Sequence, residues 1–221
     1  MNFLCISNHN NDLSWIKDYK NPYVIYDRSD NDLDLKDLNV IKSPNLGYNI
    51  YDICTFIIDN YENLPDYTTF CKGNIFPRHI SREKFEKLMN NKYFTPLFDY
   101  KLHNPKMPIC MFSSDGCYSE LNNSWYMFEG KPRKYFNNYN EFLEFIFVEP
   151  LIPIYNTFAP GGNYVVPKNN ILKYNITFYE NLRTFVSHSQ FSNESHIIER
   201  ALYSIWMCDF EVNEKMKQKI N

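Results

Sequence analysis

The chain has 221 residues, of which 44% are hydrophobic and 18% aromatic, so it carries enough apolar surface for a folded core. This length predicts one domain over residues 1–221. A net charge of −3 gives no general attraction to nucleic acid, which disfavours that partner, although Lys and Arg cluster locally at 72–92 and 131–134.

No targeting or membrane-spanning segment is expected. The first residues lack the basic segment and the apolar run of a signal peptide. The longest apolar stretch, residues 142–155, contains two glutamates and two prolines, so it is not expected to span a bilayer. We therefore expect a cytoplasmic protein, with reduced thiols and buried Cys5, Cys54 and Cys71.

The first third of the chain alternates strand-like and helix-like segments. Buried strands are predicted at residues 3–7, 23–26, 40–41 and 67–71. Helices are predicted at 12–16 and near 47–62, where apolar residues recur at helical spacing. This alternation predicts an α/β domain with a mainly parallel, mixed sheet flanked by helices.

The rest of the chain is less regular at first. We expect an irregular insertion at about 80–140, which contains one helix at 82–90. The later elements are a helix at 139–147, a strand at 163–166, and helices near 176–187 and 194–208. The polar tail after Glu211 is expected to fray.

Polar residues follow several predicted strands, and the carboxyl ends of parallel strands meet at one edge of a sheet. The candidate substrate-binding residues in these loops are Asn8, Asn10, Asp27, Asp30, Asn45, Lys72, Asn74, Arg78 and His79. The acidic run that also includes Asp32 and Asp34 could bind a divalent cation, but it lacks the Gly and Glu of an EF-hand, and a solvated loop is favoured. Lys72-Gly73-Asn74 fits a ligand-binding loop and an ordinary exposed turn equally well.

Motifs over most of the chain identify a family resemblance. They are Asn-x-Asp-Leu-Ser-Trp at 10–15, Asn45-x-Gly47, and the segments 61–66, 70–74, 161–171, 178–182 and 196–206. In this order they resemble the domain of unknown function 3431 family. Members usually have Gly-Arg-Glu where this chain has Gly47-Tyr48-Asn49, and Leu-Gln-Gly where it has Cys71-Lys72-Gly73.

The layout is also similar to GT-A nucleotide-sugar glycosyltransferases. That resemblance implies a nucleotide-sugar donor, a hydroxyl acceptor on a glycan or other polymer, and donor contacts from the first loop and from Asp27 or Asp30. It assigns the Gly-rich loop, Gly161, Gly162 and Asn163, to the floor beneath donor and acceptor. The expected metal-binding Asp-x-Asp is replaced by Lys72-Gly73-Asn74, so no metal ligand is predicted; Mg²⁺ or Mn²⁺ is the alternative to a fixed lysine charge.

The last predicted helix supplies the catalytic candidates Glu194, His196 and Glu199. A glutamate at residue 194 also fits an ordinary helix start, where its charge favours the helix dipole. Glu199 is preferred because it lies among apolar residues on its helix. The alternatives to a glycan glycosyltransferase are a non-catalytic carbohydrate- or partner-binding domain and a phage- or viral-type DNA-base glycosyltransferase.

Overall fold

A six-stranded mixed sheet forms the centre of the computed structural model, which describes residues 2–30, 37–102, 110–112, 116–127 and 129–220. The strand order across the sheet is β3 (Val40–Lys42), β2 (Tyr23–Asp27), β1 (Asn2–Asn8), β4 (Tyr67–Lys72), β9 (Tyr164–Pro167) and β5 (Thr95–Pro96). The first four are parallel, whereas β9 runs antiparallel to β4 and β5 antiparallel to β9. The prediction of a mainly parallel, mixed sheet is confirmed.

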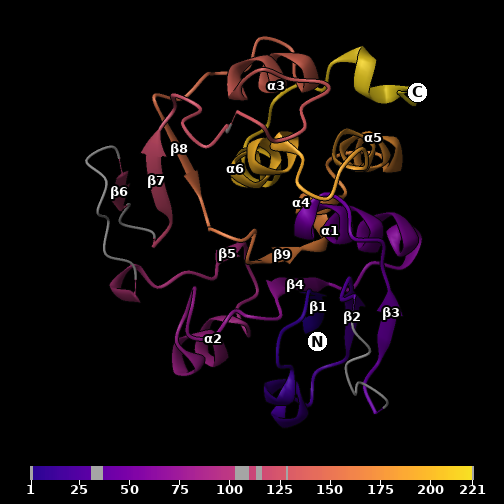
Figure 1. Cartoon of the computed structure of the whole chain (residues 1–221), viewed down its shortest axis with the longest axis vertical. Coiled ribbons are helices and arrows are strands. Elements are labelled where there is room, and N and C mark those ends of the chain that lie inside the picture. The colour runs from indigo at the N-terminus through magenta and orange to yellow at the C-terminus, as the bar shows by residue number, and fades with distance from the viewer. Residues whose placement is uncertain (1, 31–36, 103–109, 113–115, 128, 221) are drawn as a thin grey trace.

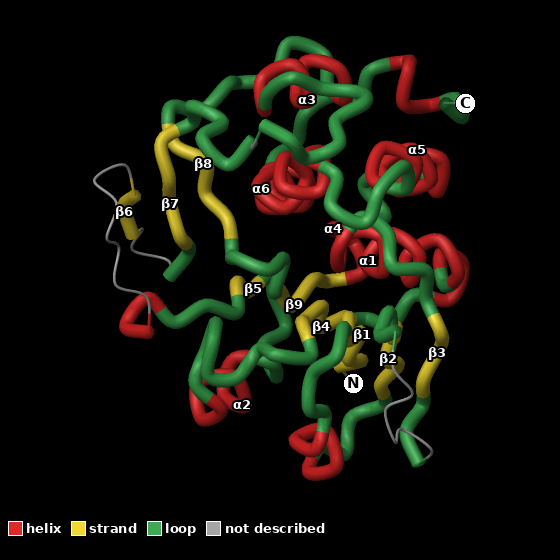
Figure 2. Tube along the Cα trace, viewed as in Figure 1, coloured by secondary structure: helices red, strands yellow, loops and turns green. Residues whose placement is uncertain are grey.

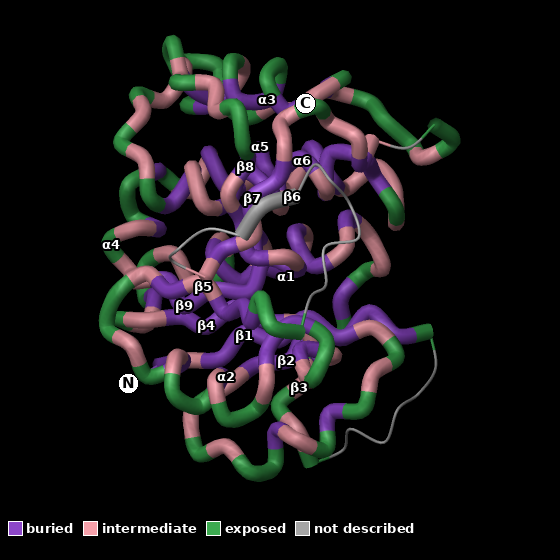
Figure 3. The backbone as a smooth tube through the Cα atoms, turned by 90° about the vertical axis from the view of Figure 1, so that its left-hand side faces the viewer, coloured by how far each residue is buried: buried purple, intermediate pink, exposed green. Residues whose placement is uncertain are grey.

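The central strands are buried along almost their whole length because both faces of the sheet are covered. In β1, Leu4 and Ile6 contact one hydrophobic core and Cys5 contacts the other, as the alternation of side chains along a strand requires. Figure 3 shows these strands buried beneath exposed loops.

One face of the sheet packs against a layer of helices (Figure 1). The helices whose side chains join this larger core are α1 (Tyr48–Asp59), α3 (Tyr139–Ile146), α5 (Ile176–Val186) and α6 (Asn193–Met207). The opposite face is covered by α2 (Arg82–Leu88) and the 3-10 helix η1 (Ser14–Asp18). Asn138 and Asn175 cap α3 and α5, since each side chain accepts a hydrogen bond from the first turn.

The middle of the chain is more ordered than expected. A second, antiparallel sheet is formed by β6 (Cys110–Phe112), β7 (Tyr118–Leu121) and β8 (Tyr155–Phe158), as Figure 2 shows. The segment 80–140, for which one helix and otherwise irregular structure were predicted, therefore also contains the short strands β5, β6 and β7. The strands of the second sheet have three or four residues each, and β8 pairs with a strand far away in the sequence, so no local pattern marks them.

The C-terminal segment is also held in place. It contains the 3-10 helix η4 (Glu214–Lys217), whose Met216 is fully buried, so the expectation of a frayed tail was wrong. The short helix α4 (Lys168–Ile171) follows β9 directly. Within the described residues, no helix has the length and hydropathy needed to cross a membrane.

Candidate functional site

Side chains from three parallel strands meet at one edge of the central sheet. The chain places β2 and β3 on one side of β1, then returns through α1 to place β4 on the other side. The carboxyl ends of β1 and β4 therefore form a topological switch point, where open α/β sheets bind ligands. At this edge Ser7 of β1 pairs with Lys72 of β4, and Asn8 pairs with Asp27 of β2.

A cavity of about 210 Å³ lies at this switch point. Its lining is Ser7, His9, Asn11, Arg28, Asn45, Tyr48, Asn49, Lys72, Asn74, Arg78, Gln190 and Phe191. This lining contains the basic side chains of Arg28, Lys72 and Arg78 and no carboxylate. Such a lining attracts an anion that can accept several hydrogen bonds, above all a phosphate or diphosphate.

Arg28 is held in this lining by a buried carboxylate. Its Nε lies 3.0 Å from Oδ2 of Asp52, which projects from α1 and is fully buried. Ser43, just after β3, donates a hydrogen bond of 2.6 Å to the other oxygen of Asp52. Burial raises the pKa of the Asp52 carboxyl to about 7, although the charge of Arg28 acts in the opposite direction.

Lys72 ends β4 and is tied to two later parts of the chain. Its backbone N–H donates to Oδ1 of Asn163 at 3.1 Å, and its Nζ lies 4.0 Å from Oε2 of Glu199 on α6. Burial lowers the pKa of the lysine, an effect that the negative charge of Glu199 opposes. The lysine ammonium thus lies between the cavity and the glutamate.

The Gly161–Gly162 turn approaches the site closely. Both glycines have positive φ, +85° and +61°. The N–H of Gly161 donates to Oε2 of Glu199 at 3.1 Å, and its carbonyl accepts from Nδ2 of Asn49 at 2.8 Å. A Cβ atom at residue 161 would lie 3.2 Å from Nε2 of the buried His79, so a side chain there would crowd the site.

His196 forms a polar cluster beside this turn. Its Nε2 lies 3.0 Å from Nζ of Lys131, and its ring centroid is 5.1 Å from that of Tyr48, which lines the cavity. Burial lowers the pKa of the imidazole to about 4, a shift that Glu199 opposes and Lys131 reinforces. His196 is therefore neutral at pH 7, and its Nε2 can accept a hydrogen bond from the ammonium of Lys131.

Glu194 is fully bonded within the protein interior and does not line the cavity. The carboxylate is fully buried, and its Oε1 accepts hydrogen bonds from the backbone N–H groups of Lys134 and Tyr135, both at 2.7 Å. Its Oε2 lies 3.0 Å from Nε2 of His188. These contacts join the start of α6 to the preceding loop and leave Glu194 outside the lining of the cavity.

Asp27 and Asp30 are not among the residues that line the cavity. Asp27 is buried and bonded to Asn8 at 2.9 Å, to the hydroxyl of Ser29 at 2.6 Å and to Lys42 at 3.3 Å. Burial acts to raise its pKa, but these hydrogen bonds outweigh it and lower the pKa below the ordinary value. Asp30 is exposed, and Asp32 and Asp34 lie outside the described residues.

Four of the predicted substrate-binding residues line the cavity: Asn45, Lys72, Asn74 and Arg78. The other predicted substrate-binding residues do not line it: Asn8, Asn10, Asp27, Asp30, His79, Gly161, Gly162 and Asn163. Sequence reasoning missed Arg28, Tyr48, Asn49, Gln190 and Phe191. Arg28 follows a predicted strand directly, so its position was a usable signal; nothing local marks the loop at 190–191.

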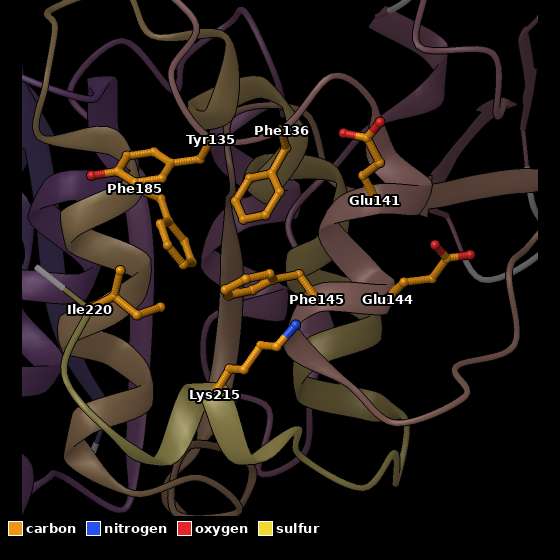
Figure 4. A pocket seen from close by; sticks show the side chains of 8 residues that line it. All are labelled: Tyr135, Phe136, Glu141, Glu144, Phe145, Phe185, Lys215 and Ile220. Atoms are coloured by element: carbon orange, nitrogen blue, oxygen red, sulfur yellow. The ribbon is translucent and has the colours of Figure 1, made fainter.

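A second hollow, of about 500 Å³, lies between α3, α5 and η4 (Figure 4). Its floor is a set of rings in edge contact, such as Phe136 against Phe185 at 5.0 Å. Figure 4 shows the carboxylates of Glu141 and Glu144 directed away from these rings. Because its polar groups do not converge, this hollow is a weaker candidate for chemistry than the cationic cavity.

Metal ligands do not cluster in the described part of the chain. Among those residues, no group of three or more His, Cys, Asp or Glu side chains is arranged to hold a metal ion. At the end of β4, where the sequence resemblance implies a metal-binding Asp-x-Asp, the structure presents Lys72 and Asn74 to the cavity. The donor set at this edge suits an anion better than a cation.

Comparison with known proteins gives one match. The family model described as "Protein of unknown function (DUF3431)" matches residues 4–220, so the chain belongs to this family. No curated protein and no solved structure matches it.

Proposed function

We propose that this member of the DUF3431 family is a glycosyltransferase with a GT-A-like fold, which moves a sugar from a nucleotide-diphosphate donor to a hydroxyl of a glycan or other polymer. The observation that carries the proposal is the cavity at the β1/β4 switch point, with Arg28, Lys72 and Arg78 in its lining and no lining carboxylate. The strand order, with an antiparallel strand beside β4, supports the GT-A assignment.

In this proposal the three cations take the role of a metal ion. The acceptor oxygen attacks the anomeric carbon of the donor sugar, and the bond from that carbon to the diphosphate oxygen breaks. Negative charge then grows on the departing diphosphate, where fixed cations stabilise it most strongly because they need no reorganisation. Lys72, at the end of β4, and Arg28, directly after β2, both line the cavity in which this diphosphate would bind.

Glu199 is the proposed base that takes the acceptor proton. It is partly exposed, with a side-chain accessibility of 15%, and lies beside Lys72 and the Gly161 turn. Neutral His196 contacts Nζ of Lys131, which also contacts the hydroxyl of Tyr48 in the cavity lining. In the proposal, His196 orients the acceptor through these contacts. Glu194 has no catalytic role here because its oxygens are already bonded in the interior.

A non-catalytic binding domain is the second candidate. It is favoured by the pairing of Glu199, whose Oε2 already accepts from Gly161 and faces Lys72. In that function the cavity binds a phosphorylated sugar or a partner's anionic group without transfer.

The experiment that tests both is a titration of the purified protein with UDP-, GDP- and dTDP-sugars by calorimetry, followed by mass spectrometry for released nucleotide. Binding with release of nucleotide supports the transferase. Binding without release, in the presence of a glycan library or of duplex DNA, supports the binding domain. Failure of all three donors to bind contradicts the proposed transferase.

A further inference from the structure

Asp52 joins loops that follow different strands of the sheet. It contacts Arg28 after β2 at 3.0 Å and Ser43 after β3 at 2.6 Å, and the hydroxyl of Ser7 at the end of β1 also hydrogen-bonds to it. Its side chain is fully buried, so no solvent compensates a change in its charge. Removing a partner from such a buried carboxylate costs free energy. The ionisation of Asp52 therefore depends on whatever else Arg28 binds.

The groups that face Asp52 are few. From β1 and α1 come the thiols of Cys5 and Cys54, whose pKa values burial raises, so both are neutral. From β2 come the phenol of Tyr26, whose pKa is also raised by burial, and the carboxylate of Asp27. Arg28 supplies the opposing positive charge. The protonation of Asp52 therefore depends on the balance between Arg28 and the negative charges near it.

Arg28 contacts Asp52 and also lines the cavity. Its Nε faces Asp52, while the residue lines the anion-binding cavity. Arg28 pairs with Asp52 through Nε, so the Nη groups of the guanidinium can serve a phosphate in the cavity. A diphosphate bound there would share the guanidinium with Asp52 and add negative charge beside it.

We propose that Asp52 is a positioning residue that holds Arg28 in the cavity and takes up a proton when a diphosphate binds. The inference rests on the proposed function, since it assumes a diphosphate ligand. It goes further by making affinity depend on pH: protonation of Asp52 removes a negative charge near the ligand, so binding tightens as the pH falls. Because burial already brings the pKa of Asp52 to about 7, the coupling acts near neutral pH.

The test is calorimetry with whichever UDP-, GDP- or dTDP-sugar binds tightest. The pyrophosphate of these compounds is a diester that stays ionised between pH 6 and 8, so the ligand adds no proton of its own. Titrations at pH 7 in Pipes and in Tris, which differ in ionisation enthalpy, measure the protons taken up. We expect the uptake of less than one proton for each ligand bound. The Kd should increase by up to about tenfold per pH unit above pH 7.

Asp52→Asn should abolish the uptake and flatten the pH dependence. Asp59→Asn, the same substitution at an exposed position of α1 outside the cavity lining, is the matched control and should retain both. Uptake that persists in Asp52→Asn, or that is lost in Asp59→Asn, overturns the inference. If none of the three sugars binds, this inference and the transferase fail together, whereas binding without proton uptake overturns this inference alone.

A second variant covers a folding failure of Asp52→Asn. Ser43→Ala keeps the carboxylate and removes a hydrogen bond that favours its ionised form. The midpoint of the pH dependence should then move upward. An unchanged midpoint in folded Ser43→Ala contradicts a role for Asp52.

Discussion

Nζ of Lys72 lies 4.0 Å from Oε2 of Glu199, so the end of strand β4 and the middle of helix α6 meet at one point. The contact places a cation and a carboxylate between the cationic cavity and the Gly161 turn. In the proposed reaction the two have different roles, one toward the leaving group and the other toward the acceptor. Their separate substitution can distinguish these roles.

Lys72→Ala should weaken donor binding. The loss of a charged hydrogen bond to the diphosphate corresponds to about 1.5–3 kcal/mol, or roughly 10- to 100-fold in Kd. Calorimetry with a UDP-sugar measures it, and Lys92→Ala, at an exposed position outside the cavity lining, is the control. Equal affinities for the two variants would remove Lys72 from the site.

Glu199→Gln should separate binding from transfer. Donor affinity should be unchanged or higher, because the substitution removes a negative charge beside Lys72. Transfer should fall by roughly 10²- to 10⁴-fold, the usual effect of a general base. Nucleotide release followed by mass spectrometry measures the rate; wild-type rates in Glu199→Gln would show that another group takes the proton.

Gly47→Ala should destabilise the start of α1. Gly47 has φ +57°, and a Cβ atom there would lie 2.6 Å from Cγ2 and 3.0 Å from the carbonyl oxygen of Val186. Left-handed backbone strain and steric overlap together predict a loss of about 2–5 kcal/mol in the free energy of unfolding. Urea denaturation measures this loss.

Gly130→Ala is the matched control for that variant. Gly130 also has positive φ, +87°, but nothing lies within 4 Å of its Cβ position. Only the backbone strain remains, so the expected loss is about 1–2 kcal/mol. Similar losses for the two variants would mean that contact with Val186 has no effect.

His196 should make the fold sensitive to acid. Its pKa falls from 6.5 to about 4 on folding, because burial disfavours the charged ring. The unfolded state therefore binds more protons between these pH values, and stability decreases as the pH falls from 6.5 toward 4. His196→Gln should reduce this loss by up to about 3 kcal/mol. Denaturation at pH 4.5 and 7.5 tests the difference; parallel pH dependences in both proteins would contradict it.

Chelation of metal should leave donor binding unchanged. The cavity lining supplies the cations Arg28, Lys72 and Arg78, so the diphosphate charge is compensated without an added ion. Titration of a UDP-sugar in EDTA and in millimolar Mg²⁺ or Mn²⁺ should give Kd values within about twofold. Binding that disappears in EDTA and returns with Mg²⁺ would contradict this mechanism.

Local patterns in the sequence were enough to predict most helices and strands of the central sheet and the loops that carry polar residues. Apolar runs with strand or helix periodicity reflect burial on particular faces, which is a property of each segment alone. They also indicated Lys72, Asn74 and Arg78, because these residues lie in the polar segment that follows a predicted strand. The short strands β6, β7 and β8 left no such trace, since their stability depends on distant pairing partners.

The tertiary structure alone decided which side chains share the cavity. Asp27 ends β2 and Arg28 follows it directly, and no local pattern says which of them faces the cavity. The carboxylate of Asp27 accepts hydrogen bonds from Asn8, Ser29 and Lys42. In contrast, Asp52 forms an ion pair with Arg28 and holds it in the lining. The physical reason is that hydrogen bonds and ion pairs between loops form only after the strands have ordered in the sheet, and these contacts set the charge of the site.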